Sequence, residues 1–301
     1  MKILIAGATG FVGSRLASAL AADGHEVRAM TRHPDGYRGA GTAVAGDVSR
    51  RESLDAALTG VEVAYYLVHS LDADDFADRD AEAASSFGSA ARAAGVGRIV
   101  YLGGLGADDP ARLPPHLRSR REVETLLADA GVPVTVLRAA IVVGDGGLSW
   151  EITRQLVKRL PVMVTPRWVS TPTQPIALAD TVRYLVAMAD HPAAAGRVFE
   201  IGGADVLTYA EMLRRVGRIS RGRAGVILSV PLLTPKLSSL WISFVTDVDT
   251  TTARHLIESM VTPVVVRDRS IHELVPGEPM GYDEMVERAF QDRVTRLGRS
   301  S

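Results

Sequence analysis

A glycine-rich turn near the N-terminus constrains this chain more than any other feature. Residues 7–13 read GATGFVG, immediately after the apolar run KILIA and immediately before a stretch with apolar residues at helical spacing. Glycines between a strand and a helix let the backbone bend sharply and approach a pyrophosphate, while the helix N-terminus favours negative charge. The simpler alternative is a purely structural turn. We expect dinucleotide binding here, at Gly7, Thr9, Gly10, Phe11, Val12 and Gly13.

The rest of the N-terminal half alternates apolar runs with helical patterns. HEVRAMTR, TAVAGD, VEVAYYLVHS, GRIVYLGGLG and VPVTVLRAAIVVG all suit buried strands. Such alternation predicts a Rossmann-type doubly wound α/β fold, whose parallel sheet binds ligands at the carboxyl ends of its strands. The pattern loosens after Gly144. We expect an NAD(P)-binding core over residues 1–144 and a substrate lobe over 145–301, from which residues 175–202 return to the core.

Two helix starts carry the spacing of a capping box, in which a hydroxyl residue and a glutamate cap each other's backbone. The first pair is Ser49 and Glu52, and the second is Thr208 and Glu211. Both pairs predict where a helix begins.

Charge and composition exclude several classes of protein. The 301 residues include 34 basic and 35 acidic ones, so no net charge attracts nucleic acid. There is no cysteine, which excludes disulfides and thiolate metal sites, and the histidines show no metal-ligand spacing. We therefore predict no metal. The N-terminus reads as a strand and not as a signal peptide, and no uninterrupted apolar run is long enough to span a bilayer. The absence of cysteine fits a cytoplasmic protein, which we expect.

Residues at the ends of three further strands are candidates for binding the cofactor. Thr31 and Arg32 end the second strand, where an acidic residue usually holds the ribose 2′-hydroxyl of NAD(H). A guanidinium suits a 2′-phosphate instead, which favours NADP(H) and leaves NAD(H) as the alternative. Asp47 and Val48 are placed to lie beside the adenine. The fourth strand ends in residues expected near the ribose on the nicotinamide side, namely Leu67, Val68 and His69.

The segment 226–246 is the most apolar of the C-terminal half, although Pro231, Pro235 and Lys236 interrupt it. Three interpretations stay open for it. It forms a buried helix hairpin, an apolar wall for a lipophilic substrate, or a surface that contacts a membrane or a partner.

At this point the chain resembles the short-chain dehydrogenase/reductase superfamily. The glycine spacing, AGDV and the strand order match its extended and atypical branches, and LVHSL, LGGLG, PHLRSR and VFEIGG are similar to the NmrA-like NAD(P)H-binding group, often labelled nucleoside-diphosphate-sugar epimerases. The resemblance extends from residue 1 to about 290. It implies a nicotinamide cofactor.

The superfamily's chemistry uses a serine, a tyrosine and a lysine, and this chain departs from all three. Gly103 or Gly104 stands at the serine position, while His116 and Arg120 replace the tyrosine and lysine, four residues apart on one helical face. A histidine near its ordinary pKa of about 6.5 can serve as general acid or base. A guanidinium stays protonated, so Arg120 can hold the ribose or polarise a substrate oxygen.

Two functions therefore remain open. The first is an NADP(H)-dependent oxidoreductase, epimerase-like or reducing a carbonyl, enone or quinone of a lipophilic small molecule, with His116 and Arg120 as its catalytic pair. The second is a non-catalytic sensor or assembly factor that binds NADP(H) and acts through a protein partner.

Overall fold

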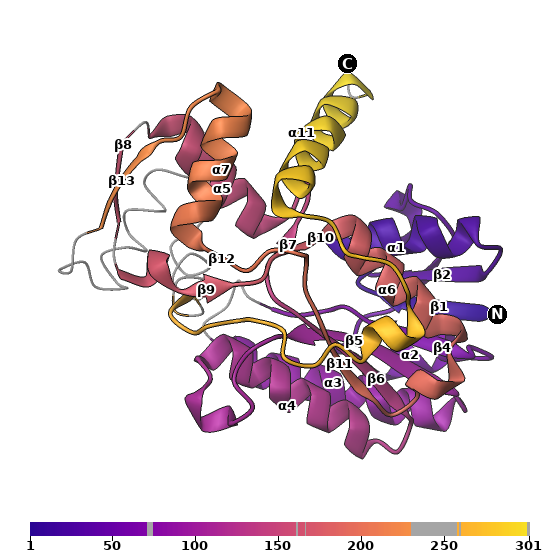
Figure 1. Ribbon diagram of the computed structural model, residues 1–301. Coiled ribbons are helices and arrows are strands. Elements are labelled where there is room, and N and C mark those ends of the chain that lie inside the picture. The colour runs from indigo at the N-terminus through magenta and orange to yellow at the C-terminus, as the bar shows by residue number, and fades with distance from the viewer. Residues whose placement is uncertain (71–74, 161, 166, 230–257, 259, 300–301) are drawn as a thin grey trace.

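The computed structural model describes residues 1–301 apart from 71–74, 161, 166, 230–257, 259 and 300–301 (Figure 1). Its centre is a seven-stranded sheet in which every pair of neighbouring strands is parallel. This confirms the predicted doubly wound α/β fold. In spatial order the strands are β3 (Thr42–Ala45), β2 (Glu26–Thr31), β1 (Lys2–Ala6), β4 (Val63–Tyr66), β5 (Arg98–Gly104), β6 (Val134–Ala139) and β11 (Val198–Ile201).

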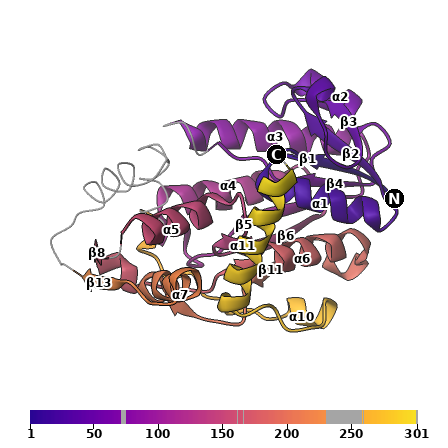
Figure 2. The same ribbon diagram turned by 90° about the horizontal axis from the view of Figure 1, so that it is seen from above.

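Helices cover both faces of this sheet (Figures 1 and 2). One face packs against α1 (Phe11–Ala22) and α6 (Leu178–Asp190), and the short α10 (Ile271–Leu274) joins the same core. The other face is covered by α2 (Arg51–Leu58), α3 (Phe76–Ala93) and α4 (Pro115–Asp129).

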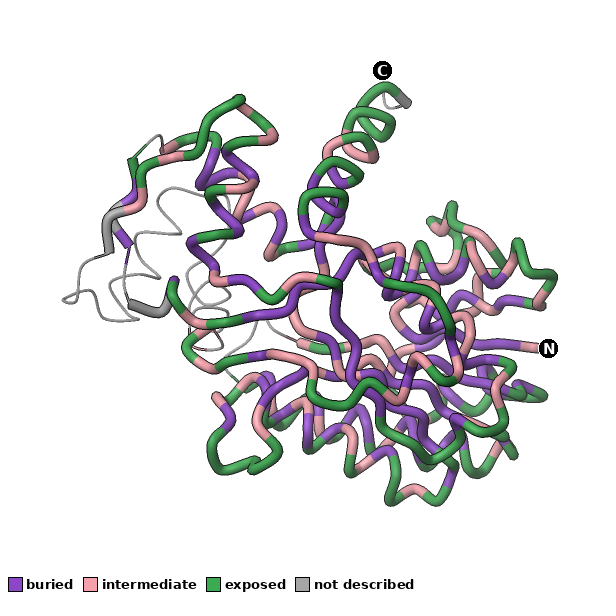
Figure 3. The backbone as a smooth tube through the Cα atoms, in the orientation of Figure 1, coloured by how far each residue is buried: buried purple, intermediate pink, exposed green. Residues whose placement is uncertain are grey.

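The alternation of side chains along β1 explains why both faces need cover. Ile3 and Ile5 point into the core shared with α1 and α6, whereas Leu4 and Ala6 point into the core shared with α2, α3 and α4. Three of these four are large aliphatic residues with no exposed surface. Burying each such side chain stabilises the fold by about 1.5–3 kcal/mol. In Figure 3 the buried backbone accordingly runs through the centre of the sheet.

A smaller lobe follows β6. Its own apolar core, which contains Trp150 and Tyr282, lies among α5 (Leu148–Arg159), α7 (Tyr209–Arg221) and α11 (Tyr282–Arg299). The C-terminal end of α11 projects away from the body of the molecule (Figure 1). Three short strand pairs connect the lobe: β7 (Val142–Val143) with β10 (Ile176–Ala177), β9 (Pro172–Thr173) with β12 (Leu207–Thr208), and β8 (Val162–Thr165) with β13 (Val226–Ser229). Single 3-10 turns lie at Pro34–Gly36, Pro110–Arg112, Arg167–Ser170 and Pro192–Ala194.

The apolar segment 226–246 differs from its expected form where it is described. Residues 226–229 form β13, parallel to β8, so the interpretation of 226–246 as a helix hairpin is wrong for these four residues. Two of them, Val226 and Ile227, are β-branched and suit a strand. The remaining residues, 230–246, lie outside the described residues, as does any test of the other two interpretations. No helix among the described residues has the length and apolar character needed to cross a membrane.

Candidate cofactor and substrate site

The glycine turn between β1 and α1 has the shape that a diphosphate requires. Gly7 has a φ of +91°, which side-chain-bearing residues rarely adopt, and its carbonyl oxygen accepts a hydrogen bond from the Gly10 N–H at 3.0 Å. A Cβ on Gly13 would overlap that same carbonyl oxygen. Both glycines are therefore needed for the helix to start so close to the strand. The exposed turn, with Thr9 at its tip, fits a nicotinamide dinucleotide.

A pocket with a volume of about 410 Å³ extends from this turn along the carboxyl ends of β1, β4, β5 and β6. The lobe closes it through the loop before α5 and through residues such as Tyr209 and Met260. Nine of the residues predicted for the site line it: Gly7, Gly10, Phe11, Val12, Gly13, Leu67, His69, His116 and Arg120. The remaining candidate at the end of β4, Val68, instead packs against the core beneath α2, α3 and α4.

A second group of predicted residues lies on the opposite side of β1, where β2 and β3 end. Thr31 closes β2 and Arg32 follows it with an exposed side chain. Partial burial raises the pKa of Asp47, but hydrogen bonds from the Ser49 N–H and hydroxyl, and the nearby Arg32, lower it by more. Asp47 is therefore ionised, with one oxygen already bound to Ser49. Val48, beside it, is half-buried.

The two groups fit the two halves of a dinucleotide. Because β1 stands between them and carries the diphosphate turn, the adenosine half belongs over β2 and β3 and the nicotinamide half over β4, β5 and β6. This division places Arg32 and Asp47 at the adenosine end, and His69, His116 and Arg120 at the nicotinamide end.

His116 and Arg120 project from α4 into the pocket, as their four-residue spacing predicts. Nη1 of Arg120 donates to the carbonyl oxygen of Leu102 at 3.3 Å, which holds the guanidinium against the end of β5. The positive charge of Arg120 is the main reason why the pKa of His69 lies well below its usual value. Desolvation and the nearby His116 add to this effect, although part of the His69 side chain is exposed at the pocket. His69 is thus a neutral imidazole at neutral pH.

The position of the family's serine is closed by packing. A Cβ on Gly104 would lie 2.7 Å from Cδ2 of Leu117, and one on Gly103 would lie 3.1 Å from the Tyr101 ring. Both glycines therefore let α4 and Tyr101 pack closely at the end of β5. Neither Ser70, after β4, nor Ser119, on α4, lines the pocket, so neither replaces that serine.

The hydroxyl of Tyr101 contacts the backbone of Arg120, yet Tyr101 does not replace the missing proton donor. Its hydroxyl donates to the backbone oxygen of Arg120 at 3.3 Å, and burial raises its pKa to about 12. Some of the pocket residues that the sequence did not reveal come from the lobe: Tyr209 begins α7, and Ser149 lies in the first turn of α5. The capping box at Thr208 and Glu211 signals the start of α7, but nothing in the sequence signals that it faces the pocket.

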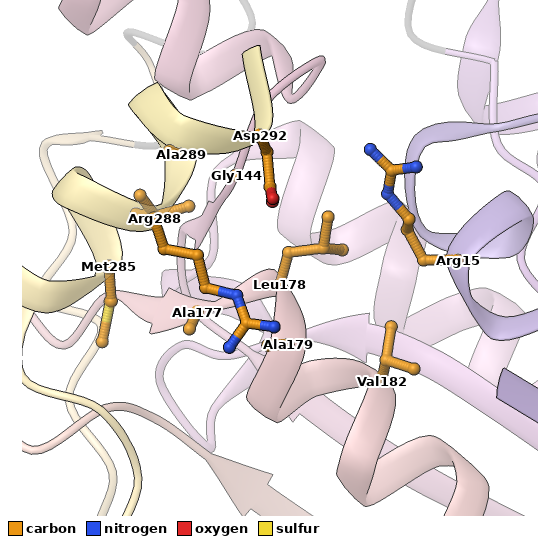
Figure 4. Close-up of a pocket in the computed structure, with 11 residues that line it drawn as sticks. Arg15, Gly144, Ala177, Leu178, Ala179, Val182, Met285, Arg288, Ala289 and Asp292 are labelled. Carbon is orange, nitrogen blue, oxygen red and sulfur yellow. The ribbon is translucent and has the colours of Figure 1, made fainter. Parts of the chain in front are cut away.

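A smaller hollow, with a volume of about 250 Å³, lies between α1, α6 and α11. In Figure 4, the guanidinium groups of Arg15 and Arg288 extend from α1 and α11 toward the space beside Leu178. Gly144 separates this hollow from the main pocket, since a Cβ there would contact Leu178 on one side and Phe11 on the other. The hollow contains none of the candidate catalytic groups.

The fold and the glycine turn together define an NAD(P)-binding protein of the Rossmann type, and comparison with known proteins agrees. A protein-family profile described as NAD(P)H-binding matches residues 7–165. The chain is 31% identical to (4-alkanoyl-5-oxo-2,5-dihydrofuran-3-yl)methyl phosphate reductase of Streptomyces griseus, over 72% of this chain and 73% of the relative. The chain therefore belongs to the NAD(P)H-binding family, and the resemblance to atypical, NmrA-like short-chain dehydrogenases/reductases is confirmed.

Two further likenesses are more distant. Photosystem II assembly factor Ycf39 of Trieres chinensis is 24% identical over 79% of this chain and 75% of its own length. The solved structure of Citrobacter sp. triphenylmethane reductase complexed with NADP(H) matches with a TM-score of 0.77, covering 96% of this chain and 100% of that chain. At 16% identity that match supports the fold alone.

Proposed function

We propose that this protein is an NADP(H)-dependent oxidoreductase that reduces a carbonyl, enone or quinone of a lipophilic small molecule. One observation carries the proposal: a single pocket joins the diphosphate turn to His116 and Arg120 and to an apolar wall. The wall includes Leu105, Leu117, Ile141, Leu148 and Val264. Such a surface suits an apolar substrate body, with the reacting oxygen at the polar end.

Arg120 and His116, both on α4, have different roles at that polar end. The bound cofactor supplies a hydride. Arg120 stabilises the negative charge that develops on the substrate oxygen, since a fixed cation is most effective inside a partly enclosed pocket. His116 then donates the proton to that oxygen. His69 is expected to pack beside the ribose at the nicotinamide end.

The preference for NADP(H) over NAD(H) is supported by the ends of β2 and β3. No acidic residue stands at the end of β2, and Arg32 is exposed there. A guanidinium binds a phosphate through two parallel hydrogen bonds. Asp47, at the end of β3, is expected beside the adenine and not at the ribose 2′-hydroxyl, and Ser49 already binds its Oδ1.

A turnover assay tests the proposal. Purified protein is given NADPH and a panel of apolar carbonyls, enones and quinones, and NADPH consumption is followed. We expect steady consumption with at least one member, and a loss of about 100-fold or more in kcat for His116→Ala, as for other general acids. His191→Ala, a histidine outside the pocket, is the matched control and keeps full activity. An active His116→Ala variant contradicts the assigned role of His116.

The relative that is an assembly factor, together with the absent serine, tyrosine and lysine, favours one second candidate. In that case the protein binds NADP(H) without turnover and acts through a protein partner. Tight cofactor binding with no consumption across the panel would support this candidate over the reductase.

A further inference from the structure

We propose that the pocket distinguishes the two oxidation states of its cofactor and binds NADPH more tightly than NADP⁺, because Arg120 places a fixed positive charge at the nicotinamide end. The inference rests on the proposed cofactor site but not on turnover. It applies to the reductase and to the non-catalytic candidate alike.

The described residues that line the pocket carry an unbalanced set of charges. Arg120, His69 and His116 are its basic groups, and no aspartate or glutamate is among these lining residues. A guanidinium remains protonated in proteins, so Arg120 contributes a full positive charge. His69, kept neutral by that charge, contributes none.

Carboxylates near Arg120 are bound by other groups of the protein. Within the described part of the chain none lies within ion-pair distance of its guanidinium, whose Nη1 instead donates to the Leu102 carbonyl. Glu124, one turn further along α4, accepts two hydrogen bonds from Arg138 at 2.6 and 3.1 Å and a third from Arg121. Asp80 of α3 is buried, does not line the pocket, and accepts from the Ser70 N–H at 2.8 Å.

The cofactor changes charge at one place only when it is oxidised. The nicotinamide ring is neutral in NADPH and carries one positive charge in NADP⁺, while the diphosphate and the 2′-phosphate are the same in both. Contacts at Gly7–Gly13 and at Arg32 therefore contribute equally to the two forms and cancel in the ratio of their affinities. The contribution of Arg120 does not cancel, because its charge repels the oxidised ring only. The pocket screens this repulsion less than bulk water does.

Equilibrium binding of the two forms tests the inference directly. NADPH and NADP⁺ are titrated separately into the wild-type protein, Arg120→Gln and Arg32→Gln, and Kd is measured by calorimetry. For the wild type we expect NADPH to bind about tenfold or more tightly than NADP⁺. Arg120→Gln brings the ratio close to one. Arg32→Gln weakens both forms by a similar factor and leaves the ratio as in the wild type.

The outcomes separate this inference from the proposed function. Equal affinities in the wild type, or a ratio unchanged in Arg120→Gln, overturn the inference and leave the cofactor site intact. If neither form binds the wild type, both proposals are overturned. Loss of a ribose contact in Arg120→Gln lowers both affinities together, so it does not alter the ratio, and circular dichroism verifies that the variant is folded.

Discussion

Arg296 of α11 binds Asp145 with two hydrogen bonds, from Nε to Oδ2 at 2.6 Å and from Nη2 to Oδ1 at 3.1 Å. Asp145 has no exposed side-chain surface, and Arg293 adds a third contact at 3.5 Å. The next residues, Gly146 and Gly147, line the main pocket. The C-terminal helix therefore fixes a wall of the site from outside.

Asp145→Asn is expected to lower the free energy of unfolding by about 1.5–3 kcal/mol, because hydrogen bonds to charged groups have that value. We expect a loss at the lower end of this range, because Arg296 is half-exposed and solvent screens part of its interaction with Asp145. Denaturant unfolding measures the change. Asp55→Asn, which removes an exposed pairing with Arg51, is the control and costs less than 1 kcal/mol. Equal losses in the two variants would contradict the structural role of Asp145.

The same carboxylate gives a pH dependence. Burial of Asp145 opposes ionisation, but hydrogen bonds from Arg296 and the charges of Arg296 and Arg293 lower its pKa below the ordinary value. A lowered pKa means that the unfolded chain binds the proton more readily, so this stabilisation is complete above the unfolded value of about 3.9 and is lost as the pH falls through the lower folded value. The stability difference between wild type and Asp145→Asn should therefore shrink below about pH 4. A difference that grows on acidification would be inconsistent with this sign.

Gly13→Ala is expected to abolish cofactor binding, because the added Cβ overlaps the Gly7 carbonyl oxygen and forces the turn apart. Gly36→Ala is the matched control, since an added Cβ there meets nothing within 4 Å. Calorimetric titration with NADPH compares the two, and melting temperature shows whether each variant is folded. Unimpaired binding by a folded Gly13→Ala protein would rule out the turn as the diphosphate site.

The two predicted capping boxes show how well local sequence patterns predict the start of a helix. Thr208 and Glu211 do cap each other as predicted, and α7 begins where the spacing indicates. Ser49 and Glu52 have the same spacing and the predicted helix does follow, from Arg51, but the capping box is wrong: Arg50 is the N-cap residue, and the Ser49 hydroxyl donates to Asp47 instead. The local pattern is identical, so the difference comes from a competing acceptor at the end of β3.

Sequence periodicity predicts the sheet and the glycine turn because each depends on residues close together in the chain. The pocket's outer wall depends on long-range pairs, such as Asp145 with Arg296, which are 151 residues apart. No local pattern encodes such a pair. For the same reason, Tyr209 and Ser149 were identified as pocket residues only from the three-dimensional structure.

Arg32→Gln is expected to raise the Kd for NADPH by about tenfold and to leave the Kd for NADH nearly unchanged, because only NADPH has a 2′-phosphate for the guanidinium. Arg38→Gln, another exposed arginine just after β2, serves as the control. Its side chain donates to the backbone oxygens of Asp35 and Tyr37, so it should alter neither affinity. A parallel loss of NADH and NADPH binding in Arg32→Gln would indicate a different role for Arg32.

Gly104→Ser restores a hydroxyl at the family's serine position, and we expect it to destabilise the protein by about 1–3 kcal/mol, as overpacking does. The added Cβ would lie 2.7 Å from Cδ2 of Leu117, a buried side chain on α4. Leu117→Ala removes that atom but leaves a cavity, which costs about 2–5 kcal/mol by itself. In the double variant the hydroxymethyl group occupies part of the cavity, so the loss should be smaller than the sum of the two single losses. Denaturant unfolding of the four proteins gives the coupling free energy, and strictly additive losses would mean that Gly104 and Leu117 do not constrain each other.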